Sequence, residues 1–443
     1  MEKRKKESYN AINYFAIARN VINNSPIYYD KSNIWYVWKK EESKWEIVDE
    51  TEVLSYVRNE NDEIVNLFYS NIKSATLNAL KIEARERQPN ELKKTEVQFR
   101  NKIIDVKTGE EREVTAKDFT FNPIQWELSD SEETPMMDKF ISECVGEKYL
   151  KTLYQWMAYH LIQSYPIHRA IVLNGSGSNG KSTFIDLMKK FLGEDNITAG
   201  DFQSVFVTRF GTSILYKKLG VFMPEADFSK IDKTAVFKSA TGNDPLLVEF
   251  KGRGAFTYEN YAKVTISTNS LPITLDKTDG FYRRFLIIDF PNKFTEKFDI
   301  LSKIPEQEYK NLTRKCVNIL KELLNNGRFH NEGSIEERRE KYERISNPLQ
   351  EFIKERVIES PDKEISKREF RTEANKWLKE KGHRQLTNNM IVKIMRDEYA
   401  EGHTRIYDGD KKTKSERAWL GITWKECFER LPEKPIIEEE IVI

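Results

Sequence analysis

One glycine-rich stretch has the residue types and spacing that phosphate chemistry needs. Gly175 to Ser182 reads GSGSNGKS and matches the phosphate-binding loop pattern at every fixed position. Glycines let such a loop turn tightly and aim backbone N–H groups at phosphate oxygens, and the following helix adds its positive end. Lys181 would then reach the terminal phosphates of a nucleotide, and the Ser182 hydroxyl would coordinate Mg²⁺. The predicted nucleotide contacts are Gly175, Ser176, Gly177, Ser178, Asn179, Gly180, Lys181, Ser182 and Thr183.

Two carboxylates and an amide follow apolar stretches downstream of this loop. LGVFMPEADF delivers Glu225 and Asp227 at a strand end, where a carboxylate can activate water or hold the hydration shell of Mg²⁺. Glu225 is the stronger candidate of the two. VTISTN ends at Asn269, whose amide could sense a terminal phosphate, with Ser267 and Thr268 as weaker candidates. An amide at a strand end also caps loops without any catalytic part, and that alternative stays open for Asn269.

Two adjacent arginines precede another apolar segment. GFYRRF places Arg283 and Arg284 just before LIIDF. The planar fork of an arginine suits the charge that develops on a transferring phosphoryl group. One of the two would act across a subunit boundary, and the other would form a structural ion pair. Spacing alone does not decide which arginine has which part.

A basic hairpin is predicted between the acidic segment and Asn269. VEF and FTY flank KGRG, which places Lys251 and Arg253 at a turn between two strands. A basic tip of this kind can grip a nucleic-acid backbone. The ordinary alternative is an exposed, solvated turn, and only the neighbouring motifs favour nucleic acid.

The surrounding pattern predicts a parallel α/β core at residues 166–300, because apolar strand segments ending in polar residues alternate with helical ones. Residues 1–165 look like an α+β domain. In NIWYVWK and KWEIV, Trp35, Val37, Trp45 and Ile47 alternate with polar neighbours, as in paired strands. A second hairpin is expected to turn at Thr108-Gly109.

A helical connector, residues 301–344, leads to a third predicted domain at 345–431. Three helical stretches are followed by HTRIYDG and RAWLGITW around a basic tip at residues 410–414, which suggests a winged helix. Its candidate contacts to DNA are Lys393, Arg396, Lys411 and Lys412. A domain that only packs on the core is the alternative. Residues 432–443 form a tail.

Composition restricts the class of protein. The 443 residues carry a net charge of +1, which by itself says nothing about nucleic acid, because positive charge can be concentrated locally. No stretch approaches the roughly 20 apolar residues that span a bilayer. The three cysteines have no metal or disulfide spacing. We therefore expect no membrane partner and a location in the cytoplasm of a host cell.

The order of these motifs resembles the superfamily 3 helicases, in particular the poxvirus, phage and plasmid primase-helicase family. The stretches that carry the resemblance are GSGSNGKST, VFMPEAD, FKSATGNDPLLVEFKGRG and STNSLPITLDKTDGFYRRFLIIDF. The resemblance implies an AAA+-like phosphate-loop core in a homo-hexameric ring, which hydrolyses ATP with Mg²⁺ and moves along single-stranded DNA in the 3′ to 5′ direction.

By the same resemblance, Glu225 would be the catalytic acid and Asn269 the sensor, and Lys238 would face the channel beside the hairpin. Many relatives have two adjacent acids where Pro224 precedes Glu225 here, so the part of Asp227 is open. No primase signature occurs. A primase would reside on another chain or in a missing N-terminal segment, and a polymerase is another expected partner.

Two other functions are consistent with parts of the sequence. One is a phosphate-loop ATPase or kinase that acts on something other than nucleic acid, but no second ligand cluster supports it. The other is a replication initiator that ATP switches between oligomeric states on duplex origin DNA, without processive unwinding. A motor should be stimulated by single-stranded DNA, whereas a switch should hydrolyse ATP slowly whether DNA is present or not.

Overall fold

The computed structural model describes residues 12–425, except for 61–69, 176, 225–229, 232, 253, 270, 275, 295–298, 382, 384, 397 and 409–410. The chain divides into two compact units. The first comprises Met1–Thr268 and Thr274–Arg339, and the second comprises Asn269–Ile273 and Glu340–Ile443. Among the described residues, no helix combines the length and the hydrophobicity that crossing a membrane requires.

The first unit opens with a three-stranded antiparallel sheet, in the order β1-β2-β3, that is buried on both faces. Trp35 and Val37 pack against three helices, whereas Tyr36 and Trp45 contact a separate aromatic cluster. The predicted strand pair is confirmed, but Ile47 is exposed. The elements are α1 (Tyr14–Asn24), β1 (Ile27–Tyr29), β2 (Trp35–Lys39), β3 (Lys44–Val48), α2 (Glu50–Glu60) and α3 (Ser70–Arg85).

Short strands follow, and they include the second predicted hairpin. β6 pairs with both β5 and β7. The turn at Thr108-Gly109 is confirmed, because Gly109 has a φ of +83° and its N–H donates to the Asp105 carbonyl at 2.7 Å. The strands are β4 (Asn90–Glu91), β5 (Glu96–Gln98), β6 (Ile103–Asp105), β7 (Glu111–Arg112) and β8 (Asp118–Phe119).

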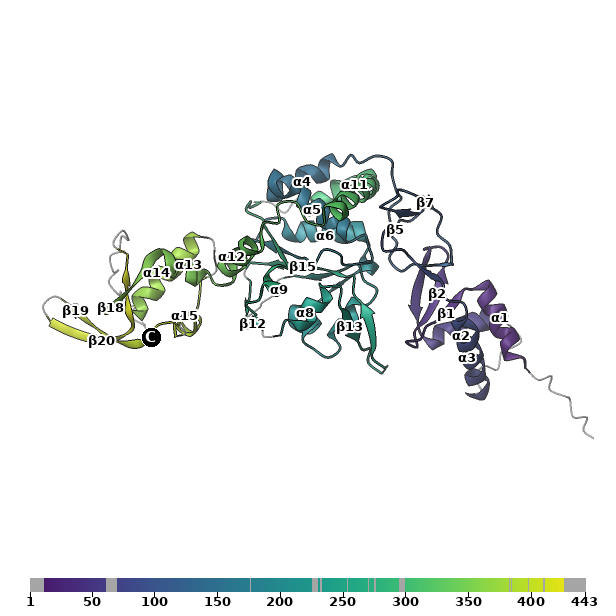
Figure 1. The fold of residues 1–443 in the computed structure, drawn as a ribbon, viewed down its shortest axis with the longest axis horizontal. Coiled ribbons are helices and arrows are strands. Elements are labelled where there is room, and N and C mark those ends of the chain that lie inside the picture. Colours follow the sequence, from purple (N-terminus) through teal and green to yellow (C-terminus); the bar gives the residue numbers. More distant parts are fainter. Residues whose placement is uncertain are drawn as a thin grey trace, which may run out of the picture. The chain divides into compact units, whose positions relative to one another are not determined.

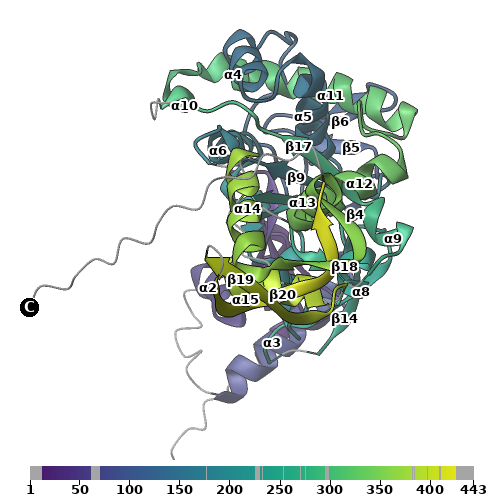
Figure 2. The ribbon, with the colours of Figure 1, turned by 90° about the vertical axis from the view of Figure 1, so that its left-hand side faces the viewer.

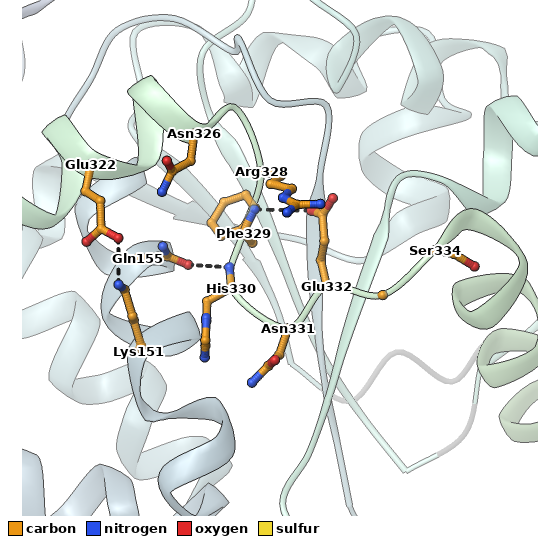
Figure 3. A pocket seen from close by; sticks show the side chains of 11 residues that line it. Lys151, Gln155, Glu322, Asn326, Arg328, Phe329, His330, Asn331, Glu332 and Ser334 are labelled. Carbon is orange, nitrogen blue, oxygen red and sulfur yellow. Dashed lines mark hydrogen bonds and ion pairs between the residues drawn. The ribbon is translucent and has the colours of Figure 1, made fainter.

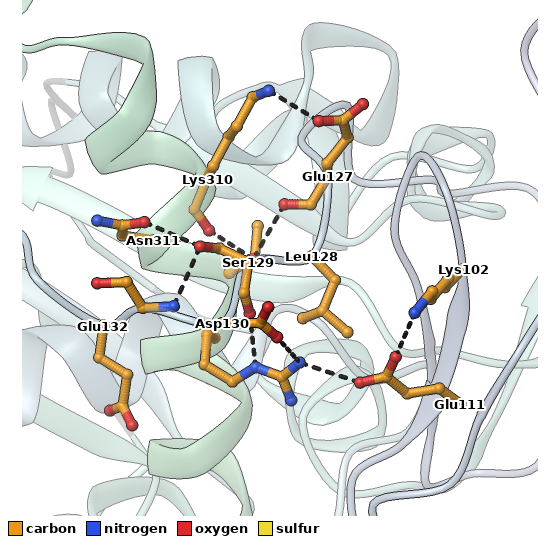
Figure 4. A network of polar contacts seen from close by, with 12 residues as sticks. Lys102, Glu111, Glu127, Leu128, Ser129, Asp130, Glu132, Lys310 and Asn311 are labelled. Atoms are coloured by element: carbon orange, nitrogen blue, oxygen red, sulfur yellow. Dashed lines mark hydrogen bonds and ion pairs between the residues drawn. The ribbon is translucent and has the colours of Figure 1, made fainter.

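A polar network fixes the segment that joins these strands to the core (Figure 4). Arg314 on α11 (Glu306–Asn326) donates to the Ser129 carbonyl at 2.7 Å and pairs with Glu111 at 3.0 Å. Lys310 pairs with Glu127 at 2.7 Å. One helix therefore holds both the connecting segment and the β6–β7 hairpin.

The centre of the first unit is a five-stranded parallel sheet in the order β10-β11-β15-β9-β17. Its strands are β9 (Ala170–Asn174), β10 (Ile197–Ala199), β11 (Gly220–Met223), β15 (Lys263–Thr268) and β17 (Phe285–Asp289). Four of them were predicted, and the three-residue β10 was not. All residues of β15 and the first four of β9 are buried, as expected for a sheet covered on both faces. Because every strand is parallel, all carboxyl ends lie at one edge.

Helices cover both faces of this sheet (Figures 1 and 2). In both views α4 (Pro135–Val145), α5 (Glu147–Tyr159) and α11 lie above it, and α8 (Ala235–Ala240) lies below. α6 (Lys181–Leu192) buries an apolar face in the same core. The other elements are η2 (Glu194–Asn196), α7 (Phe202–Phe206), η3 (Gly211–Leu215), β12 (Lys230–Ile231), β13 (Pro245–Val248), β14 (Phe256–Glu259), β16 (Ile273–Thr274), α9 (Asp279–Tyr282), α10 (Ile300–Lys303) and α12 (Ile335–Ser346).

In its described residues, the second unit contains α13, α14 and α15, the end of α12, and an antiparallel sheet in the order β18-β20-β19. The helices agree with the predicted ones, but β18 was not predicted. The sequence predicted Lys411 to Lys414 at the tip of the hairpin. They lie within β20 instead, so this part of the prediction is wrong. The winged-helix assignment stays a prediction. The elements are α13 (Pro348–Arg356), β18 (Val357–Ser366), α14 (Lys367–Glu380), α15 (Asn388–Arg396), β19 (Glu401–Asp408) and β20 (Lys411–Trp424).

Candidate functional site

The glycine loop joins the carboxyl end of β9 to the first residue of α6, and glycine is required at two of its positions. Gly180 has a φ of +87°, and a Cβ there would overlap the Cys144 sulfur. A Cβ on Gly175 would lie 2.8 Å from the Phe290 backbone carbonyl oxygen. The backbone therefore turns where a side chain would not fit, as the sequence pattern predicts.

Lys181 crosses the base of this loop. Its side chain is buried, and its ammonium donates to the Gly175 carbonyl at 2.6 Å and to Asn179 Oδ1 at 3.0 Å. Asn179 in turn donates to the Phe290 carbonyl at 3.1 Å. Ser182, the next residue of α6, is exposed. A cation and the amino end of a helix thus lie together, which is an arrangement suited to a phosphate group.

Several polar residues share the carboxyl edge of the sheet with the loop. Thr268 ends β15 opposite Asn174, and both Thr268 and Ser267 are buried. Asn269 follows directly and is exposed. Sequence reasoning missed Asp289, the last residue of β17, whose carboxylate accepts a hydrogen bond from Asn174 at 2.8 Å. The signal in the sequence was the polar Asp289 at the end of the apolar run FLIID.

The predicted acids lie outside the described residues, and so do Ser176 and Arg253. β11 ends at Met223, opposite Ile266, two residues before Glu225. β11 therefore ends at the same edge of the sheet that carries the glycine loop. Within the described part of the chain, no group of three His, Cys, Asp or Glu side chains could hold a metal ion.

The two arginines have different surroundings. Arg284 is buried, and its guanidinium donates to Thr241 Oγ1 and to the Lys238 carbonyl, each at 2.9 Å, and also to the Gly280 carbonyl. Burial, together with the neighbouring charge of Arg283, lowers the pKa of Arg284 from its ordinary value. Arg283 is exposed. Of the pair, Arg283 is therefore the one whose guanidinium a second molecule can reach.

The predicted basic hairpin is present. β13 and β14 pair in antiparallel register from Pro245↔Glu259 to Val248↔Phe256, and the exposed Lys251 lies in the turn beside Gly252. Lys238 on α8 forms an ion pair with Asp276 at 2.8 Å.

Asp276 also accepts hydrogen bonds from Thr234 and Thr278. Burial raises the pKa of the Asp276 carboxyl, but the hydrogen bonds from Lys238 and the two threonines outweigh it, so the pKa lies below its ordinary value. The carboxylate is therefore charged near neutral pH and holds Lys238 in place.

Cations of the second unit differ in how they are held. Lys393 is exposed on α15, whereas the Arg396 guanidinium pairs with Glu401. In the register of the β19–β20 ladder, Lys411 lies opposite Asp408, and Lys412 lies opposite Tyr407. Of the four predicted residues, Lys393 is thus exposed and Arg396 is held in an ion pair, and the part of all four in DNA binding stays a prediction.

A polar pocket of about 720 Å³ lies elsewhere in the first unit (Figure 3). α5 and the loop after α11 line it, and Lys151 pairs with Glu322 at 2.7 Å on one wall. Gln155 accepts a hydrogen bond from the His330 backbone at 2.7 Å. None of the residues lining this pocket is a predicted site residue.

Comparisons with known proteins find two family matches. Residues 17–146 match a family described as D5 N terminal like, and residues 173–284 match a family of unknown function, DUF5906. No curated protein matches the chain. The D5 N-terminal-like match supports the resemblance to the phage and viral primase-helicase family, while the assignment to superfamily 3 stays a prediction.

Two solved structures are similar to this chain. The apo structure of the NrS-1 C terminal region (305-718) is 11% identical, with a TM-score of 0.52, and the match covers 93% of this chain and 99% of that one. The A form apo structure of the NrS-1 C terminal region is 14% identical, with a TM-score of 0.45, and covers 91% and 98% of the two chains. The first of these likenesses shows a shared fold.

Proposed function

We propose that this chain is an ATP-dependent replicative DNA helicase of superfamily 3, from a virus, plasmid or integrated mobile element, which moves on single-stranded DNA as a ring. One observation carries the proposal. The glycine loop with Lys181 lies at the carboxyl edge of a parallel sheet, which is where open α/β folds bind their ligands.

ATP would bind with its phosphates against the loop. In the structure Lys181 donates to loop oxygens, and phosphate oxygens would replace these acceptors. The exposed Ser182 hydroxyl fits Mg²⁺, which neutralises developing phosphate charge when it is bound. Glu225 would activate the attacking water, and Asn269 would sense the terminal phosphate.

The position of Arg283 favours action on a neighbouring copy. Arg283 lies before the amino end of β17, whereas the glycine loop lies at the carboxyl edge of the same sheet. At about 3.3 Å per residue, the four steps from the first to the last Cα of β17 span about 13 Å, beyond the reach of an arginine side chain. Arg283 would therefore complete the ATP site of an adjacent subunit, as arginine fingers supplied in trans do.

The hairpin would hold the DNA strand. Lys251 and Arg253 would contact backbone phosphates, and the binding would weaken as salt rises. Lys238 is the neighbouring cation on α8 and is held by Asp276.

The first test measures ATP hydrolysis with and without single-stranded DNA. We expect DNA to stimulate the wild type strongly, and Lys181→Ala and Glu225→Gln each to abolish the stimulated rate. A Lys251→Ala/Arg253→Ala variant should keep basal hydrolysis and lose strand displacement. Hydrolysis that ignores DNA in the wild type would rule out the motor, and normal unwinding by the hairpin variant would rule out the hairpin assignment.

The exposed Lys393 on α15 favours one second candidate, an ATP-switched initiator that binds duplex DNA through the second unit. Its signature would be ATP-dependent oligomerisation on duplex DNA, slow hydrolysis and no displacement of a strand. Lys393→Glu would then weaken duplex binding while leaving hydrolysis unchanged.

A further inference from the structure

The buried guanidinium of Arg284 joins two parts of the first unit that are far apart in sequence. It comes from the segment between α9 and β17, and it donates to groups at the end of α8. Thr241 Oγ1, one of the acceptors, also donates to the Phe237 carbonyl at 2.7 Å. The residue before Arg284 is the exposed Arg283. If Arg283 moves, the backbone of Arg284 beside it is displaced as well.

The contact leaves no free space. A Cβ on Gly242 would lie 2.9 Å from an Arg284 nitrogen and 2.6 Å from the Lys238 carbonyl. Phe237 packs against Phe285 in a stacked arrangement with ring centroids 5.4 Å apart. Because packed interiors do not deform continuously, the end of α8 and the start of β17 move together or not at all.

The end of α8 is also tied to both strands of the basic hairpin. Asn260 follows β14, is buried, and donates to the Ala240 carbonyl at 2.8 Å. β13 begins at Pro245, only five residues after α8 ends. α8 is held further by the pair of Lys238 with Asp276. Hydrogen bonds from Arg284 and Asn260, together with the short chain connection to β13, thus link the segment before β17 to the base of the hairpin through the end of α8.

We infer that Arg284 is a positioning residue that couples contact of Arg283 with the neighbour's ATP to the position of the β13–β14 hairpin. The inference rests on the proposed function and adds the route by which DNA on the hairpin and ATP at the subunit boundary affect each other. By reciprocity of the binding free energies, DNA held by the hairpin also favours the position in which Arg283 contacts the neighbour's ATP. An arginine held in that position stabilises the transition-state charge and so raises hydrolysis.

The test is a matched pair of substitutions at Thr241. Thr241→Val removes the acceptor of the Arg284 Nε hydrogen at nearly constant volume, whereas Thr241→Ser keeps the hydroxyl. ATP hydrolysis is measured with and without single-stranded DNA, together with DNA affinity. We expect Thr241→Val to keep basal hydrolysis and DNA affinity and to lower the stimulation by DNA to about one-fold, and Thr241→Ser to keep the stimulation of the wild type.

The ratio of stimulated to basal hydrolysis distinguishes the proposed coupling from a purely structural role of Thr241. If Thr241 only stabilises the fold, Thr241→Val lowers the melting temperature and both rates in proportion, the stimulation ratio stays that of the wild type, and the inference is overturned. If the wild type itself is not stimulated, the proposed function fails and the inference with it. Should Thr241→Val not fold, Asp276→Asn loosens α8 instead, and an unchanged stimulation ratio in that variant overturns the inference.

Discussion

The two edges of the central sheet place the candidate site residues in different ways. At the carboxyl edge, Lys181 is set by the loop in which it lies, because its acceptors are at Gly175 and Asn179. At the amino edge, Arg283 adjoins Arg284 in the chain. Two acceptors of Arg284, Thr241 Oγ1 and the Lys238 carbonyl, lie more than 40 residues away, and the third is the nearby Gly280 carbonyl. A local motif thus defines one edge, and tertiary packing defines the other.

This difference explains why one site can be recognised from spacing and the other cannot. A phosphate loop carries its geometry in consecutive residues. Two adjacent arginines look alike until burial separates them, since only a packed structure shows that Arg284 is enclosed and Arg283 is exposed.

The largest expected effect comes from the arginine pair. Arg283→Ala should lower the rate of ATP hydrolysis about 1,000-fold or more, the range for a lost arginine finger, without changing stability. Arg284→Ala should lower the free energy of unfolding by about 3 kcal/mol, because buried acceptors lose a charged donor. Steady-state hydrolysis and urea unfolding measure the two effects. Equal loss of stability in both variants would remove the distinction between the arginines.

An intermediate effect is expected in the glycine loop, where two glycines form a matched pair. Gly177 and Gly180 both have positive φ, but a Cβ on Gly177 has open space, while one on Gly180 meets Cys144. Gly177→Ala should lower the free energy of unfolding by about 1 kcal/mol from the left-handed backbone alone, and Gly180→Ala by about 3 kcal/mol, since overpacking adds to it.

Urea unfolding of the two glycine variants, with nucleotide binding measured in parallel, tests whether packing within and beside the loop fixes its conformation. Equal losses of stability would mean that packing on Cys144 does not constrain the loop. In that case the contrast between the two edges would be weaker than the structure indicates.

The last effect is absent at neutral pH and develops only in acid, at the buried His160. Burial lowers the pKa of His160 to about 3, and its Nδ1 bonds the Trp156 carbonyl at 2.7 Å. Unfolded histidine takes up a proton below about pH 6.5, whereas folded His160 stays neutral, so its contribution is complete above that pH and is lost as pH falls towards 3. Between pH 6 and 4 the wild type should lose about 1.4 kcal/mol per pH unit more than His160→Phe.

Denaturant unfolding at several pH values gives this difference directly. The carboxylates that lose stabilising contacts in acid, such as Asp276, are common to both proteins and cancel in the comparison. Parallel pH profiles of the wild type and His160→Phe would show that His160 charges readily in the folded state.

Much of the core could be predicted from sequence because its signals are local. The strand before the glycine loop, the helix after it and the helix end at Gly193 follow from apolar runs and glycine positions, and all three are present. The hairpin β13–β14 follows from apolar stretches on either side of KGRG.

The parts that were missed depend on contacts between distant residues. β10 has three residues and is defined only by pairing with β11, and β18 is defined by pairing with β20. The partner of Lys238 lies 38 residues away at Asp276. No window of the sequence contains both members of these pairs, so periodicity could not find them.

Mixing two inactive variants tests most directly whether the two edges of neighbouring copies form one ATP site. Lys181→Ala lacks the cation at the carboxyl edge, and Arg283→Ala lacks the arginine at the amino edge. Each variant should therefore be inactive alone. Random mixing joins an intact loop to an intact Arg283 at roughly a quarter of the boundaries of a closed ring. The account predicts that the mixture regains hydrolysis stimulated by single-stranded DNA. No recovery in mixed oligomers of demonstrated composition would contradict it.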